Sequence, residues 1–239
     1  LSGGEKQKIA IAAMLAARPD VLIFDEPTSN LDPSATAEIF RVIQKIREST
    51  AITVIVIEHK VNFLREFQPR LIEMQEGRIV SDQWLSDWQA SSYINTQPVG
   101  EVLKRTPLLS LRDIRAGYDQ VPFLDSISLD VYPGDFIAVM GDNGSGKSTL
   151  LQTIANLVQP LAGHVWLAGE DTHRKRVSEL ARSIGYVFQN PAHQLFANRV
   201  REEALFAPSN FGILDDEMTD HARQLLQKAG LLEREKDHP

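Results

Sequence analysis

The stretch 141–149, with the sequence GDNGSGKST, follows the pattern of a glycine, four residues and then Gly-Lys-Ser/Thr. The apolar run 136–140 before it is short enough for a buried strand. The run from Lys147 to about Leu157 has no glycine or proline and is typical of a helix. Such a loop lets backbone N–H groups turn toward a phosphate, and the helix N-terminus adds about half a positive charge. The stretch therefore predicts a triphosphate-binding loop in an α/β fold; the alternative is a glycine-rich turn before a helix.

Two side chains of this loop have specific expected tasks. Lys147 would reach the outer phosphates of a nucleotide, and Ser148 would hold Mg²⁺. The residues expected around the phosphates are Gly141, Asn143, Gly144, Ser145, Gly146, Lys147, Ser148 and Thr149.

The composition narrows the class of protein. The 239 residues are 43% hydrophobic and 24% charged, which is typical of a globular chain with one large domain or two small ones. A net charge of −7 argues against a nucleic-acid-binding surface, so no nucleic acid is expected as a partner. The absence of cysteine excludes disulfides and thiolate metal sites. The aliphatic run 52–57 is far shorter than the roughly 20 residues of a membrane span.

A second group of chemically active side chains follows two other apolar runs. The run 21–24 has the character of a central parallel strand and ends in the adjacent carboxylates Asp25 and Glu26. The run 52–57 ends in Glu58 and His59. Ligands bind at the carboxyl ends of strands in open α/β sheets. Alone, an acidic pair or a histidine after a strand is more often structural.

The remaining patterns predict the other elements and one joint. A helix opens at 1–5 and runs to 17, and another follows from 33 to about 48 with Ile39, Val42, Ile43 and Ile46 buried. A hairpin is expected at 70–75 and 78–80, strands at 108–116, 123–131, 164–167 and 184–188, and helices at 199–206 and 216–229. Residues 117–119 are expected to divide the strands around them, and Trp84 and Trp88 to cap a core. We expect segments 1–85 and 107–239 with a linker at 86–106.

Several of these motifs resemble those of the ATP-binding-cassette (ABC) ATPases. LSGGE at 1–5 resembles the signature motif, VLIFDEPTSNLD at 21–32 the Walker B strand with the D-loop, and IEHK at 57–60 the switch-histidine segment. Tyr118 stands where that family has an adenine-stacking aromatic, and Gln189 where it has the Q-loop glutamine. The resemblance implies a phosphate-loop NTPase core with a mostly parallel sheet, an antiparallel β subdomain and a partial helical subdomain.

The order of the motifs departs from that of one cassette. Signature, Walker B and histidine come first, and the aromatic, phosphate loop and Q-loop follow. We interpret the chain, which begins at Leu1, as a fragment with the back half of one cassette and the front half of a second, hence in circularly permuted order. Because unpaired strand edges are costly, we expect the halves to pack as one permuted domain with Asp25 within about 10 Å of Ser148.

The resemblance implies a role for each site residue. Asp25, Ser148 and Gln189 would serve Mg²⁺, Glu26 would polarise the attacking water, and His59 would contact the γ-phosphate. The alternatives are a polar strand end for Gln189 and simple packing for Tyr118.

The signature residues are implied to act across an interface. Ser2, Gly3 and Gly4 would close on a nucleotide held by a second cassette, from the same full-length chain or from a second copy. The segment 188–208, FQNPAHQLFANRVREEALFAP, resembles the ATPases of energy-coupling-factor importers.

The resemblance thus implies an ATP-hydrolysing subunit that energises a membrane importer of a vitamin, vitamin precursor or metal ion. It would lie at the cytoplasmic face of the membrane and contact a transmembrane coupling subunit. One alternative is a non-transport ABC ATPase of DNA repair or translation, but the long coiled-coil insertion or basic linker usual there is not visible. The other is a binding module that no longer hydrolyses ATP. Glu26 and His59 argue against it for the parent protein, whereas the activity of the fragment alone is left open.

Overall fold

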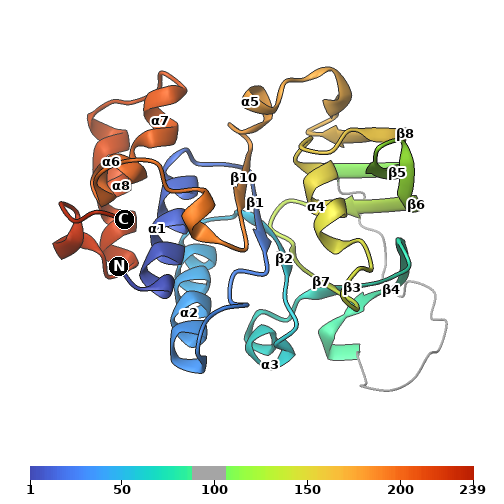
Figure 1. Ribbon diagram of the computed structural model, residues 1–239, viewed down its shortest axis with the longest axis horizontal. Coiled ribbons are helices and arrows are strands. Elements are labelled where there is room, and N and C mark those ends of the chain that lie inside the picture. The colour runs from blue at the N-terminus through green and yellow to red at the C-terminus, as the bar shows by residue number, and fades with distance from the viewer. Residues whose placement is uncertain (88–105) are drawn as a thin grey trace. The chain divides into compact units, whose positions relative to one another are not determined.

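A computed structural model describes residues 1–87 and 106–239 (Figure 1). They form two compact units, one of Leu1–Ile52 with Ala181–Pro239 and the other of Thr53–Leu180. We call these the helical unit and the sheet unit. Each unit contains residues from before and after 88–105. The units therefore do not coincide with the expected segments 1–85 and 107–239. Most of the expected linker, and Trp88, lie outside the described residues.

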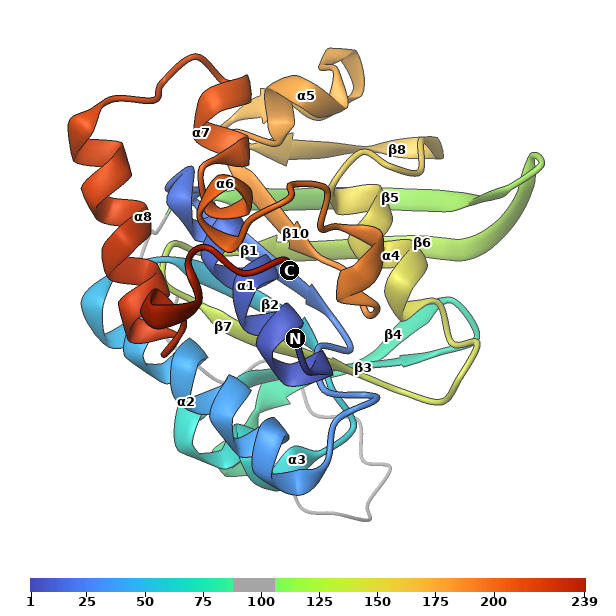
Figure 2. The same cartoon turned by 60° about the vertical axis from the view of Figure 1, so that its left-hand side comes forward.

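The helical unit is built on one pair of parallel strands. β1 (Val21–Asp25) pairs with β10 (Ile184–Val187), with Val21 opposite Ile184 and Phe24 opposite Val187. Every residue of both strands is buried, as expected for parallel strands covered on both faces. Figure 2 shows these strands side by side, although they come from opposite ends of the sequence.

Helices supply the rest of this unit. α1 (Gly3–Ala16) packs against α2 (Pro33–Ser49), α6 (Val200–Ala204), α7 (Phe206–Asn210) and α8 (Asp216–Lys228). Two 3₁₀ turns, η4 (Pro191–His193) and η5 (Leu232–Arg234), complete it. In α2, Asp32 caps the start and Pro33 occupies the first turn. The predicted burial of Ile39, Val42, Ile43 and Ile46 is confirmed.

The helix predicted at 199–206 is wrong in its extent, because two short helices, α6 and α7, stand there and reach residue 210. Proline has no N–H, so a continuous helix through Pro208 would leave the Ala204 carbonyl without its usual donor. The chain instead turns at Leu205, with φ −96° and ψ 0°.

The sheet unit contains the phosphate-loop stretch at the end of a central strand. β7 (Phe136–Met140) lies between β2 (Thr53–Ile57) and β3 (Arg70–Gln75), and all three are parallel. β4 (Arg78–Trp84) continues this sheet antiparallel to β3, which confirms the hairpin and extends it. The short α3 (Val61–Leu64), η1 (Arg65–Phe67) and η2 (Leu85–Asp87) complete this part. α4 (Lys147–Ile154) follows the loop as predicted, but it ends three residues before the expected Leu157.

A second, antiparallel sheet belongs to the same unit. Its order is β6 (Val121–Val131), β5 (Leu109–Tyr118), β8 (Pro160–Leu167) and β9 (Glu170–Asp171), and η3 (Thr172–Arg174) and α5 (Val177–Leu180) follow it. The division expected at 117–119 is wrong by one to two residues. Asp119 and Gln120 form the turn with φ of 51° and 63°, the two positive values that a tight hairpin turn of two residues requires.

The predicted α/β fold class, with parallel strands, an antiparallel β part and a partial set of helices, is confirmed. The packing of the two units as one permuted domain would be a relation between them and stays a prediction. Within the described residues, no helix is both long and apolar enough to span a bilayer.

Candidate functional site

The phosphate loop of the sheet unit has a backbone that demands glycine at its ends. Gly141 has φ 139° and Gly146 has φ 102°, a region that side-chain-bearing residues rarely adopt. A Cβ on Gly141 would lie 2.1 Å from the Met74 carbonyl oxygen, and one on Gly146 would lie 2.7 Å from Leu124 Cδ2. The sequence therefore folds here into a tight loop that tolerates no side chain at Gly141 or Gly146.

Lys147 lies across this loop. Its ammonium donates to the carbonyl oxygens of Gly141 and Asp142, at 2.9 Å each, and the residue is 5% exposed. A buried lysine held by backbone carbonyls is pre-positioned for an anionic ligand in the loop. The hydroxyl of Ser145 is also buried and has no hydrogen-bond partner among the described residues. A donor left unsatisfied in this loop fits the binding of a phosphate oxygen.

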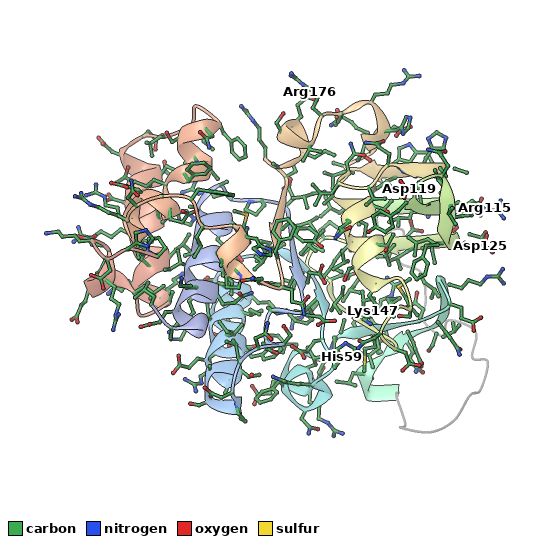
Figure 3. All side chains as sticks on the ribbon, viewed as in Figure 1. His59, Arg115, Asp119, Asp125, Lys147 and Arg176 are labelled. Carbon is green, nitrogen blue, oxygen red and sulfur yellow. The ribbon has the colours of Figure 1, made fainter. Side chains whose placement is uncertain are left out.

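His59 is brought to the same sheet edge as the loop. β2 and β7 are parallel neighbours with Ile57 opposite Val139, so the segments that follow them leave the sheet on the same side. Figure 3 labels His59 and Lys147, which follow these two strands. The buried carboxylate of Glu58 accepts from the backbone N–H groups of His59 and Lys60, at 2.9 and 3.0 Å. Glu58 thus shapes the turn that presents the exposed His59.

Tyr118 ends β5, and its hydroxyl donates to Gln152 of α4 at 2.9 Å. The residue is 54% exposed, so it can offer a ring face to a ligand. The other expected phosphate-loop residues, Asn143, Gly144, Ser148 and Thr149, lie in the loop or the first turn of α4.

The two acids lie in the helical unit, at the carboxyl end of β1. Asp25 is 7% exposed and accepts a hydrogen bond of 2.8 Å from the Tyr186 hydroxyl to its Oδ2. Glu26 has a left-handed φ of 47°, a backbone strain often found at functional sites. Its Oε2 accepts from Gln189 Nε2 at 3.1 Å. The pairing of β1 with β10 thus brings Gln189 to the acids.

The signature residues form the start of α1. The Ser2 hydroxyl accepts from the Glu5 N–H at 3.3 Å, and Glu5 Oε2 accepts from the Ser2 N–H at 2.8 Å, which is a capping box. The hydrogen bond from the Ser2 backbone lowers the pKa of Glu5 below its usual range. Gly3 and Gly4 follow in the first turn, and Ser2 and Gly3 are exposed.

The predicted site residues therefore divide between the units. The helical unit holds Ser2, Gly3, Gly4, Asp25, Glu26 and Gln189, and the sheet unit holds His59, Tyr118 and the phosphate loop. The predicted approach of Asp25 to Ser148 would join the two and stays a prediction.

The donors expected for Mg²⁺ are oxygens of a carboxylate, a hydroxyl and an amide, from Asp25, Ser148 and Gln189. Mg²⁺ prefers such hard ligands and usually takes one or two from the protein with phosphate oxygens and water. Among residues 1–87 and 106–239, no cluster of three or more His, Cys, Asp or Glu side chains could hold a metal. The donor chemistry of these three side chains matches the preference of Mg²⁺.

The sequence analysis missed three side chains whose hydrogen bonds fix the segments around the candidate site. Tyr186 and Gln194 fix the segment after β10, and the buried Glu203 accepts from the N–H groups of Phe196 and Ala197, at 2.7 Å each. One signal was available, because a tyrosine in an otherwise apolar buried strand usually has a hydrogen-bond partner for its hydroxyl.

Comparisons with family models match two parts of the chain. The model described as ABC transporter matches residues 124–239. A model described as an AAA domain matches residues 1–64.

Relatives are similar over the whole chain. One from Methanosarcina mazei is 34% identical over 248 residues, which cover all of this chain and 49% of the relative. Another from that organism is 32% identical over 295 residues, covering 100% of this chain and 50% of the relative. One from Methanosarcina acetivorans is 32% identical over 252 residues, which cover 100% of this chain and 47% of the relative. Their names assign them provisionally to the ABC transporter ATP-binding proteins. The chain spans about half the length of these relatives.

Two solved structures are similar to part of the chain. The cbiO1 protein of Clostridium perfringens, described as part of the ABC transporter complex cbiONQ, has a TM-score of 0.49 and 27% identity over 55% of this chain and 54% of that protein. An ATP-binding subunit of an ABC transporter has the same TM-score and coverage with 25% identity.

Proposed function

We propose that the chain binds ATP with Mg²⁺ and hydrolyses it to energise an importer of a small solute. The premise is that the family-model match and the relatives support membership in the ABC transporter ATP-binding proteins. The observation that carries the proposal is the phosphate loop with Lys147 across it. Its backbone amides, the start of α4 and the ammonium together offer positive charge to a triphosphate.

Nucleotide binding would involve three parts of the sheet unit. The loop would take the phosphates, with Lys147 exchanging its carbonyl partners for phosphate oxygens. Tyr118 would stack on adenine, which is worth about 1–3 kcal/mol on the scale for bases on aromatic side chains. His59 would contact the γ-phosphate from the neighbouring strand end.

Hydrolysis would draw on the helical unit as well. Mg²⁺, when bound, neutralises charge on the phosphates. Asp25 and Gln189, with Ser148, would hold it. Glu26 would accept a hydrogen bond from the attacking water and orient it, and its hydrogen bond from Gln189 gives that carboxylate a defined position.

The signature residues would serve a second cassette. Ser2 and the amides of Gly3 and Gly4 stand at a helix start, where an anion is favoured. They would cap the nucleotide of a partner cassette, in the same full-length chain or in a second copy. One chain of this length would then need its partner to close a site.

The importer class rests on the resemblance of segment 188–208 to the ATPases of energy-coupling-factor importers. We propose a vitamin, vitamin precursor or metal ion as the solute, a transmembrane coupling subunit as the partner, and a peripheral position at the cytoplasmic face of the membrane. Reconstitution of the full-length protein with its membrane subunit would test this class, and the absence of ATP-dependent uptake of any such solute would contradict it.

The binding proposal is tested by Lys147→Ala. We expect the affinity for a fluorescent ATP analogue with Mg²⁺ to fall at least about tenfold, because a charge-assisted contact to the phosphates is lost. Lys175→Ala is the matched control, since Lys175 is paired with Glu170 on the surface of the same unit. Equal affinities of all three proteins, or no binding by the unsubstituted chain, would contradict the proposal.

A further inference from the structure

A set of hydrogen bonds in the helical unit lies beside the two acids, and its centre is a tyrosine without an assigned role. Tyr186 is in β10, is 7% exposed and donates from its hydroxyl to Asp25 Oδ2 at 2.8 Å. Both partners are buried, so the contact is shielded from water.

We propose that Tyr186 is a positioning residue whose hydroxyl orients the Asp25 carboxylate and so sets the affinity of the nucleotide site for its divalent metal. The inference rests on the proposed function, in which Asp25 serves Mg²⁺.

The strand register explains why this tyrosine reaches this acid. Tyr186 lies opposite Ile23 in the parallel pair, and Asp25 is two residues further along β1. Since side chains alternate along a strand, Ile23 and Asp25 share one face of it. The tyrosine on that face leans along the strand and meets the carboxylate at its end.

The tyrosine is itself held firmly. Its backbone carbonyl accepts from Gln194 Nε2 at 2.7 Å, and Gln194 Oε1 accepts from the Phe188 N–H at 3.2 Å. Its ring packs against that of Phe188, with centroids 4.6 Å apart. A donor fixed by its backbone and its ring can impose a direction on the carboxylate that it contacts.

The two acids are therefore held by different donors of one segment. Tyr186 donates to Asp25, and Gln189 donates to Glu26. Loss of the tyrosine hydroxyl should thus disturb the metal partner and leave the contact to Glu26 in place. A purely structural hydroxyl would instead change stability alone.

The experiment compares Tyr186→Phe with the unsubstituted chain, since phenylalanine keeps the ring and removes only the donor. Mn²⁺ binding in the presence of a non-hydrolysable ATP analogue is measured by electron paramagnetic resonance. We expect the Mn²⁺ dissociation constant to rise about three- to tenfold, while binding of the analogue without metal changes by less than about twofold. Asp25→Asn gives the benchmark for loss of the metal partner, and Tyr132→Phe is the control for removal of a tyrosine hydroxyl elsewhere.

The possible outcomes distinguish failure of the positioning role of Tyr186 from failure of the proposed function. If the unsubstituted chain binds Mn²⁺ with the analogue and Tyr186→Phe binds it equally well, the positioning role is overturned and the proposed function stands. If the unsubstituted chain binds neither Mn²⁺ nor the ATP analogue, the positioning role and the proposed function are both overturned. Circular dichroism checks that Tyr186→Phe is folded, and Tyr186→Met serves as a second donor-free variant should phenylalanine perturb the strand.

Discussion

At the scale of single residues, Ser2 caps a helix, and the proposed function would give it a second task. Its hydroxyl oxygen accepts from the Glu5 N–H and so caps α1. A serine hydroxyl that accepts one hydrogen bond can still donate its own proton. In the proposed function, Ser2 would therefore stabilise the helix and offer a donor to a phosphate at once, with the capping box fixing its position.

The cap makes a measurable contribution to stability. We expect Ser2→Ala to lower the free energy of unfolding by about 1 kcal/mol, the usual cost of replacing an N-cap serine by alanine. Urea unfolding followed by circular dichroism would measure it. Ser209→Ala, at an exposed position in α7, is the control. A change no larger than that of the control would show that the capping box is not maintained in solution.

Motif residues could be located from the sequence, because their chemistry depends on neighbours in the chain. Lys147 and the glycines around it are set by the local loop, and the structure has the loop and helix where the pattern predicts them. Tyr186 and Glu203 could not be found in this way. Their partners Asp25 and Phe196 are joined to them by tertiary packing, which no local pattern specifies.

At the scale of elements, α1 and α8 form a contact that contains a titratable group. His221 of α8 is partly buried and makes a hydrogen bond with the Leu15 backbone. Burial first, and then the charges of Arg18 and Lys228, lower the pKa of His221, while the Leu15 contact and Glu217 oppose the shift. The neutral imidazole is therefore the form that the folded protein prefers.

This preference predicts a dependence of stability on pH. Because the folded pKa lies below the unfolded value of 6.5, the unfolded chain binds more protons in the window beneath 6.5. The His221 contribution is present above that value and is lost as the pH falls through the folded pKa. We expect thermal unfolding temperatures measured from pH 8 to pH 5 to fall less in His221→Gln than in the unsubstituted chain. His193→Gln, at an exposed position, is the control, and parallel curves for all three would contradict the assignment.

Element boundaries show where sequence patterns fail. The helix at 216–229 was predicted almost to the residue, since its polar and apolar positions alternate with helical spacing. The strand at 164–167 begins instead at Pro160, because β8 continues along β5 through residues that are only partly buried. Such residues carry no clear apolar pattern, so pairing with a neighbouring strand decides the boundary.

At the scale of the whole molecule, each unit depends on both sides of residues 88–105. Residues 1–52 meet 181–239 in one unit, and 53–87 meet 106–180 in the other. The motifs gave the order of the segments, but which strands pair across so long a separation depends on tertiary contacts that the sequence pattern does not encode.

Because each unit contains residues from before and after 88–105, we expect the segments 1–87 and 106–239 to bind each other without a covalent link. Residues 1–87 and 106–239, produced together as separate chains, should copurify and unfold in one transition. Each piece alone should be poorly folded, because the pairs β1–β10 and β2–β7 would be lost and β3 would keep β4 but lose β7. Size-exclusion chromatography and circular dichroism would test this. Two pieces that elute separately, each with native secondary structure, would show the units to be independent of this pairing.

The β1–β10 pairing has a consequence for the folding of the chain during its synthesis on the ribosome. Asp25 and Tyr186 are 161 positions apart. At roughly 5–20 residues per second, β1 emerges about 10–30 s before its partner strand is made. If residues 1–239 are synthesised by themselves, the apolar residues of β1 stay unpaired during that time, and the nascent chain is exposed to aggregation.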